Sequence, residues 1–112
     1  ALAPLLERFQ RDPRAATRAL GVLAKERRAL VAVLALRCMQ DAGVDVNTFH
    51  YGAVLSACER CSRWELAVHV LGSMLEAEAA PNGVCCNAAI IACKKGGQWQ
   101  RALAVLLQMD DL

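Results

Sequence analysis

The sequence is poor in aromatic residues, and it has neither a strong net charge nor a long apolar run. Aromatic residues make up 4% of the chain, whereas 56% of its residues are apolar, mostly Ala, Leu and Val. Ala and Leu are strong helix formers, so this composition predicts an all-α fold. No apolar run reaches the roughly 18 to 20 residues of a membrane-spanning helix. We therefore expect a domain that is not transmembrane.

The charge of the chain is small and unevenly distributed. A net charge of +2 is far from the strong positive field of a dedicated nucleic-acid module. Residues 1–42 carry eight basic and four acidic groups, whereas residues 43–112 carry five basic and seven acidic groups. An anionic partner would therefore bind near the N-terminal end, although we favour the simpler interpretation that these charges lie on solvated helix faces.

The most informative feature is an internal repeat. A shift of 35 residues aligns 46–77 with 81–112, and nine of these 32 positions are identical. A period of this length is typical of helical-repeat arrays. We therefore predict a right-handed α-solenoid of antiparallel helix pairs. The residues expected to form the repeat core are Trp64, Ala67, Leu71, Met74, Trp99, Ala102, Leu106 and Met109.

The period divides the chain into four parts. Residues 1–12 are expected to form a covering helix, 13–47 a degenerate first repeat, 48–82 a second repeat, and 83–112 a third repeat that is incomplete at its C-terminus. Asp12-Pro13 predicts the start of a helix, because Asp is a good cap and Pro is tolerated at the first helical position. Helices are expected over 14–25, 27–40 and 48–60, and Gly43 is expected to end the first hairpin.

The second helix of each repeat is expected to begin near a tryptophan or its replacement. Ser62-Arg-Trp-Glu65 has the pattern of a capping box, in which side chains satisfy the first amides of a helix. Trp64 and Trp99 lie one period apart, which favours packing within each hairpin over a role as base-stacking platforms. Ala29 replaces this tryptophan in the first repeat, so this repeat should be more weakly packed or should pack on something else.

The six cysteines do not form an obvious disulfide or metal framework. Five of them, Cys38, Cys58, Cys85, Cys86 and Cys93, lie in apolar helical runs, where free Cys behaves as a small hydrophobe. We therefore expect a reducing compartment. Cys58-x-x-Cys61 has the spacing of half a zinc or redox site, but the next repeat has Gly96 in place of Cys61, which indicates repeat drift.

The sequence offers no other chemistry of a recognisable kind. His50 and His69 have no ligand spacing with the cysteines, and we expect His69 to be exposed or incidentally packed. We find no supported Ser/His/Asp arrangement, no paired catalytic carboxylates and no phosphate loop. We therefore expect neither enzymatic activity nor a bound cofactor or metal.

The third repeat carries the motif by which the chain resembles a known family. Its residues Pro81, Asn82, Ala92, Cys93, Gly96, Ala102, Leu103 and Met109 have the spacing of a pentatricopeptide repeat. The resemblance covers about residues 13–112 and is strongest over 44–112. Members of that family are mostly organellar and bind single-stranded RNA, one base per repeat, so the resemblance implies a plastid or mitochondrial protein.

The resemblance also implies which residues would read bases. In that family a side chain in the first turn of the first helix acts with the last residue of the repeat. These positions are Thr17 with Asn47, Gly52 with Asn82, and Asn87, whose partner would lie beyond Leu112. The positions that sandwich a base are Arg14, Phe49 and Val84.

Only the Thr17 and Asn47 pair is complete, because Gly52 has no side chain. Stacking of three bases would contribute about 3 to 9 kcal/mol, against an association cost of about 4 to 15 kcal/mol. We therefore favour a non-catalytic scaffold that docks onto other proteins as an accessory subunit of an organellar ribosome, respiratory or photosynthetic complex. The alternative is sequence-selective binding of single-stranded RNA by a fragment of a longer repeat protein.

Overall fold

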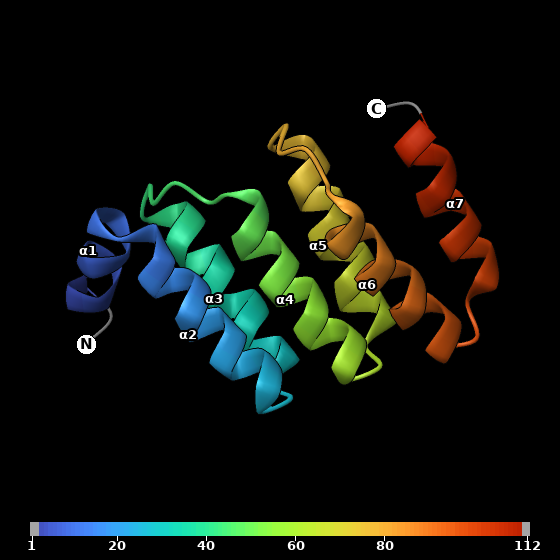
Figure 1. Cartoon of the computed structure of the whole chain (residues 1–112), viewed down its shortest axis with the longest axis horizontal. Coiled ribbons are helices and arrows are strands. Elements are labelled where there is room, and N and C mark those ends of the chain that lie inside the picture. Colours follow the sequence, from blue (N-terminus) through green and yellow to red (C-terminus); the bar gives the residue numbers. More distant parts are fainter. Residues whose placement is uncertain (1–2, 111–112) are drawn as a thin grey trace.

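The chain folds into consecutive pairs of antiparallel helices (Figure 1). The computed structural model describes residues 3–110, and the side chains of these residues except 3, 5, 6, 105, 106 and 108–110. Within this range the helices are α1 (Ala3–Arg11), α2 (Pro13–Lys25), α3 (Ala29–Asp41), α4 (Thr48–Arg60), α5 (Trp64–Glu76), α6 (Gly83–Lys95) and α7 (Trp99–Asp110).

The helices form two layers. The first helices of the pairs, α2, α4 and α6, lie side by side, and α4 packs against both of its neighbours (Figure 1). The second helices, α3, α5 and α7, pack against them as the other layer, and α1 packs on α2. The described part measures 41 × 29 × 19 Å, as expected for a short stack of hairpins. The prediction of an all-α solenoid of helix pairs is therefore confirmed.

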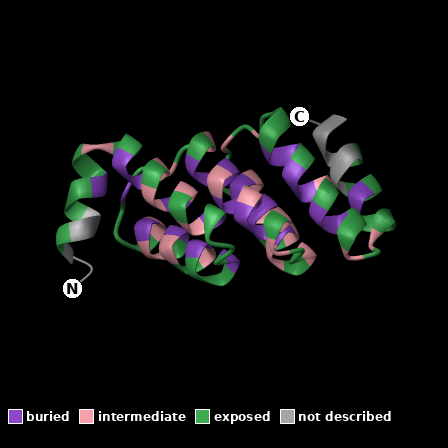
Figure 2. Ribbon diagram, turned by 60° about the horizontal axis from the view of Figure 1, so that its bottom comes forward, coloured by how far each residue is buried: buried purple, intermediate pink, exposed green. Residues whose placement is uncertain are grey.

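The core lies between the two layers and consists largely of small residues at helical spacing. In α5 the buried residues are Ala67, Val70, Leu71 and Met74, which recur every three or four positions on one stripe. Figure 2 shows buried stripes of this kind where the helices face each other. Small side chains let the helix backbones approach closely, so the core is closely packed without many aromatic rings.

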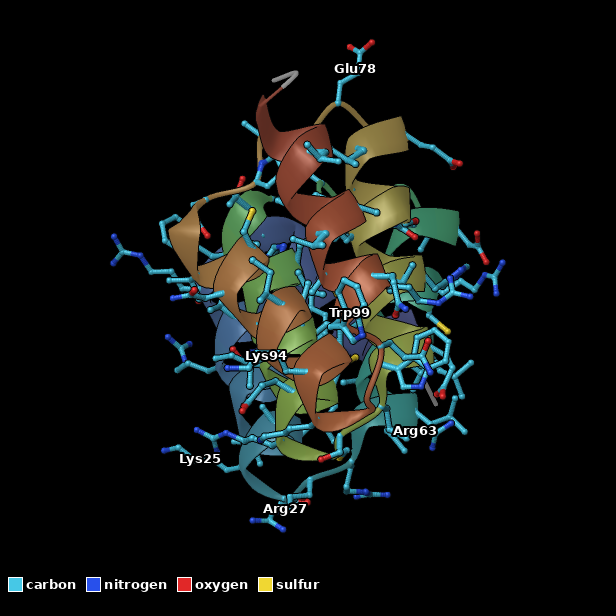
Figure 3. All side chains as sticks on the ribbon, turned by 90° about the vertical axis from the view of Figure 1, so that its right-hand side faces the viewer. Lys25, Arg27, Arg63, Glu78, Lys94 and Trp99 are labelled. Carbon is cyan, nitrogen blue, oxygen red and sulfur yellow. The ribbon has the colours of Figure 1, made fainter. Side chains whose placement is uncertain are left out.

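Most of the described residues predicted for the repeat core are buried. Ala67, Leu71, Met74 and Ala102 are buried, and Trp64 is half-buried. The prediction is wrong for Trp99, whose side chain is 60% exposed on the outer surface of α7 (Figure 3). The side chains of Leu106 and Met109 lie outside the described residues, so their predicted burial stays a prediction.

Trp64 and Trp99 differ in burial because the Trp64 indole packs against the following repeat and not within its own hairpin. A Cβ atom added to Gly96 would meet Trp64 at Cδ1 and, at 2.9 Å, at Cγ, so the ring lies against the turn between α6 and α7. The Arg101 guanidinium lies 4.6 Å from the centre of the same ring, as in a cation–π contact. The third repeat therefore covers the tryptophan of the second.

The starts of the first helices follow the sequence closely. The Asp12 side chain accepts a hydrogen bond from the Arg14 amide, as predicted, and Asn47 and Asn82 cap α4 and α6 in the same manner. The predicted end of the first hairpin at Gly43 is also confirmed, because this residue has a φ of +77°.

The starts of the second helices differ from expectation. The predicted capping box at Ser62 is wrong: Arg63 is the N-cap of α5, and no side chain caps it. Ser62 has a φ of +54°, which places it in the left-handed region, and Arg27 has a φ of +56° in the same register. The helix predicted to start at Arg27 therefore starts at Ala29 instead.

Replacing Ser62 with glycine should raise the free energy of unfolding by about 1 kcal/mol. A left-handed conformation costs a residue with a Cβ about 1 to 2 kcal/mol, and the third repeat already has Gly97, at a φ of +71°, in this register. Ser56→Gly within α4 is the matched control and should lower stability by about 0.5 to 1 kcal/mol. Urea unfolding checks both, and equal destabilisation by the two variants would contradict the left-handed geometry at Ser62.

Candidate nucleic-acid interface

A recess opens at the N-terminal ends of α2 and α4, between the first and second repeats. Its volume is about 840 Å³, which is within the range of pockets that hold small organic ligands. Its lining residues are Asp12, Pro13, Arg14, Thr17, Arg18, Asn47 and Phe49. The structure thus brings together the complete reading pair and two of the sandwich positions that the sequence indicated.

An exposed aromatic ring lies beside positive charge in this recess. The Phe49 side chain is 70% exposed on the first turn of α4, where it makes little contribution to the core. Arg14 and Arg18 line the same recess from α2, and both are exposed. A solvent-exposed phenyl ring with neighbouring guanidinium groups can stack on a planar base while a cation lies near its phosphate.

The polar side chains of the recess are partly engaged by the backbone. The Thr17 hydroxyl donates to the Pro13 carbonyl at 3.2 Å, which leaves its oxygen as an acceptor. The Asn47 side-chain oxygen accepts from the His50 amide at 3.0 Å, which leaves its NH₂ group as a donor. One donor and one acceptor thus remain for the edge of a ligand.

Asp12 would oppose an anionic ligand, but its charge is offset. Its carboxylate accepts from the Arg14 amide at 3.1 Å and lies 3.5 Å from the Arg18 guanidinium. Both members of this ion pair are about half-exposed, so the pair contributes little to stability. Its main effect is to keep Arg18 at the mouth of the recess.

His50, to which the sequence assigned no role, links the two helices that form the recess. The side chain is fully buried, and its Nδ1 accepts from the Asn47 amide at 3.1 Å. Nε2 therefore carries the proton and donates to the Pro13 carbonyl at 2.9 Å. His50 joins the starts of α2 and α4, and it fixes the distance between Thr17 and Asn47. Its partner is distant in sequence, so no local pattern reveals this role.

The corresponding positions of the next repeat carry different side chains. Gly52 is buried, and a Cβ there would lie 3.6 Å from the Cys85 Sγ, at ordinary contact distance. Asn82 and Asn87 are exposed but are not among the residues that line the recess. Val84 is 61% exposed at the position that corresponds to Phe49. The candidate positions therefore continue along α4 and α6, but Gly52 offers no polar side chain and Val84 offers a smaller apolar surface than Phe49.

A row of basic residues follows the opposite ends of the same helices. Lys25, Arg60 and Lys95 lie in the last turns of α2, α4 and α6, one per repeat. The Lys95 ammonium is paired with Glu59 at 2.7 Å, whereas no ion pair is found for Lys25 or Arg60 among the described side chains. Figure 3 shows Lys25 near the end of the molecule that lies opposite Glu78. The row places one basic side chain at the C-terminal end of each of α2, α4 and α6.

The cysteine pair shows no activated chemistry. Burial raises the pKa of the Cys58 thiol to about 12, so the thiol stays protonated at neutral pH. The Cys61 thiol donates to the Arg27 carbonyl of the first repeat at 3.0 Å. No cluster of three or more metal-binding side chains is found among the described residues. Across the same range, every helix is too short or too polar to span a membrane.

Comparisons with known proteins agree with the repeat register. The family model for the PPR repeat matches residues 49–78 and 84–112, which together make up more than half of the chain. A comparison with curated proteins finds no match.

Proposed function

Because the chain belongs to the pentatricopeptide repeat family, a family of helical scaffolds that bind RNA or proteins, we propose that it binds single-stranded RNA without catalysing a reaction. The observation that carries this proposal is the recess lined by Arg14, Thr17, Asn47 and Phe49. It combines a stacking surface, positive charge and a free donor and acceptor. These are the groups that a base and its phosphate require.

The geometry favours one well-defined base position and a weaker path along the stack. Phe49 can stack on a base in the recess, and Val84 offers a smaller apolar surface one repeat further on. Lys25 and Arg60 lie at the far ends of α2 and α4, about 20 Å from the recess, so they add a general attraction for a polyanion and do not contact a base held at Phe49. One stacked base contributes about 1 to 3 kcal/mol, so we expect weak and salt-dependent binding by this chain alone.

Phe49→Ala should weaken the binding of single-stranded RNA by about tenfold, because the ring supplies the main stacking surface. A fluorescently labelled random RNA of about a dozen nucleotides, titrated at low salt and followed by anisotropy, measures the effect. Val22→Ala is the matched control, since Val22 is a 52% exposed apolar residue of α2 that does not line the recess. The proposal fails if the unaltered chain does not bind the RNA, or if both variants bind equally well.

Docking onto other proteins is the second candidate function. It is supported by the apolar residues that α3 and α7 expose, among them Leu30, Leu34, Leu103 and Leu107, each at least 50% exposed. In this role the chain would be an accessory subunit of a plastid or mitochondrial assembly. A failure of the RNA titration leaves this candidate as the favoured one.

A further inference from the structure

The outer face of α3 exposes a group of large apolar side chains. Leu30 and Leu34 are 52% and 51% exposed, and Val31 between them is 39% exposed. Leu30 and Leu34 are one helical turn apart, so they lie on the same side of the helix. Adjacent exposed apolar side chains, unlike scattered ones, are typical of surfaces that another molecule covers.

The repeat register indicates that stacking of further repeats would not cover these leucines. The corresponding residues of α5 are Glu65 and His69. A further repeat, formed by α6 and α7, is stacked beyond α5, yet both residues stay exposed. Leu103 of α7 behaves differently, because its counterpart Val68 is half-buried inside the stack. The apolar residues of α7 therefore occupy stacking positions, whereas Leu30 and Leu34 do not.

Positive charge lies at the end of this face where α3 and α5 begin. A cleft of about 370 Å³ there is lined by Leu30 and Val31 together with Arg27, Arg28 and Arg63. Arg28 and Arg63 lie 3.6 and 3.7 Å from Glu26 and Glu65, so three arginines meet two carboxylates and this end keeps an excess of one positive charge. Figure 3 shows Arg27 and Arg63 at the end of the molecule opposite Glu78.

Negative charge lies at the other end of the same face. A groove of about 280 Å³ between α3 and α5 is lined by Val33, Leu36, Arg37, Gln40, Asp41, His69, Val70, Ser73 and Glu76. Asp41 and Glu76 outnumber Arg37 there, and no described side chain forms an ion pair with either carboxylate. The dipoles of α3 and α5 add to this polarity, because both helices begin at the arginine end.

We propose that the outer surface of α3 and α5 docks an amphipathic helix of a partner protein. The apolar stripe of that helix covers Leu30 and Leu34, its acidic end lies at Arg27, Arg28 and Arg63, and its basic end lies at Asp41 and Glu76. The 13 residues of α3 span about 20 Å, which a partner helix of about 14 residues matches. Nucleic acid fits this surface less well, since its uniform negative charge would meet the two free carboxylates.

This inference provides a surface for the second candidate function, and it does not require RNA binding. The recess lies at the starts of α2 and α4 in one helix layer, whereas Leu30 and Leu34 lie on α3 in the other. A variant can therefore change one surface without changing the other.

The test uses the full chain and a synthetic helical peptide of about 18 residues. The peptide has leucines at helical spacing on one stripe, glutamates near one end and lysines near the other. The double variant Leu30→Glu, Leu34→His should weaken its binding by about tenfold, as measured by fluorescence anisotropy. These replacements are the residues that α5 carries in the same register, so they are compatible with the fold.

Three controls define the outcome. Val22→Glu changes an equally exposed apolar residue of α2 and should leave peptide binding unchanged. A peptide with lysines at both ends should bind about tenfold more weakly than the first, because the arginines repel it. RNA binding should be unchanged by the double variant.

The proposal is overturned by several results. These are no binding of the first peptide, equal binding of the two peptides, an undiminished affinity in the double variant, or displacement of the peptide by single-stranded RNA. It is also overturned if sedimentation shows that the unaltered chain self-associates and that the double variant abolishes this, because a second copy would then be the occupant.

Discussion

Replacing His50 with alanine should lower the free energy of unfolding by about 3 to 5 kcal/mol. The imidazole is fully buried, and its loss leaves the Asn47 amide without its acceptor and removes one donor from the Pro13 carbonyl, which keeps the Thr17 hydroxyl. An unsatisfied buried amide costs about 1 to 3 kcal/mol, and the cavity left by the ring adds to this. Domains of this size have a total stability of about 5 to 15 kcal/mol, so the variant should be close to unfolding at 37 °C.

Two further variants separate the role of His50 from a general effect of losing a histidine. His69→Ala removes an exposed imidazole and should change stability by less than about 0.5 kcal/mol. His50→Cys should fall between the two, because the third repeat carries Cys85 in this register and its thiol donates to the Thr48 carbonyl at 3.8 Å. Thermal unfolding followed by circular dichroism measures all three. Similar melting temperatures for the His50 and His69 alanine variants would show that the hydrogen bonds to Pro13 and Asn47 contribute little.

Gly96→Ala should lower the free energy of unfolding by about 1 to 3 kcal/mol, although alanine is normally the better helix former. The added Cβ would meet the Trp64 ring at Cδ1, and it would lie 2.9 Å from Cγ and 3.1 Å from Nε1. The Arg101 guanidinium lies over the same ring, so a shift of the indole away from Gly96 would disturb that contact. Urea unfolding of the variant measures the cost.

Gly72→Ala is the matched control for Gly96. A Cβ at Gly72 meets nothing within 4 Å, so this helical position should gain about 0.5 to 1 kcal/mol from the same replacement. Trp64→Ala in the Gly96→Ala background should cost less than Trp64→Ala alone, since the two changes act on one contact. If Gly96→Ala stabilises the chain as Gly72→Ala does, the contact between Trp64 and Gly96 is not tight.

The sequence predicts the helices well because their ends carry local signals. Pro13, Gly43, Asn47 and Asn82 mark starts and ends that depend on neighbouring residues only, and the structure places them where the patterns indicate. The second helices are predicted less well. Serine is a residue type that commonly caps helices, so the sequence suggested a cap at Ser62. The turn instead requires a left-handed conformation there, and a serine gives no sequence signal for that conformation.

Contacts between repeats are what sequence reasoning missed. His50 and Pro13 are 37 residues apart, and so are Cys85 and Thr48, yet the side chains that make the equivalent bonds are chemically different. Identity across the period therefore could not reveal them. The residues that line the recess were easier to find, because the resemblance to a known repeat supplied Thr17, Asn47, Phe49 and Arg14 as a set, and their role in reading bases stays a prediction. Its polar chemistry, in which backbone caps use part of Thr17 and Asn47, needed the structure.

The contact between Trp64 and Gly96 also restricts which repeat can follow which. Gly96 in the turn of the third repeat faces Trp64 of the second repeat. One repeat earlier, Cys61 takes the place of Gly96 and Ala29 takes the place of Trp64. The larger turn residue is thus matched with the small Ala29, and glycine is matched with the large Trp64. A tandem duplication of the third repeat would place Trp99 against a glycine and could stack on itself, whereas a duplicated second repeat would place Trp64 against a cysteine and could not. Repeats in this chain are therefore not interchangeable modules.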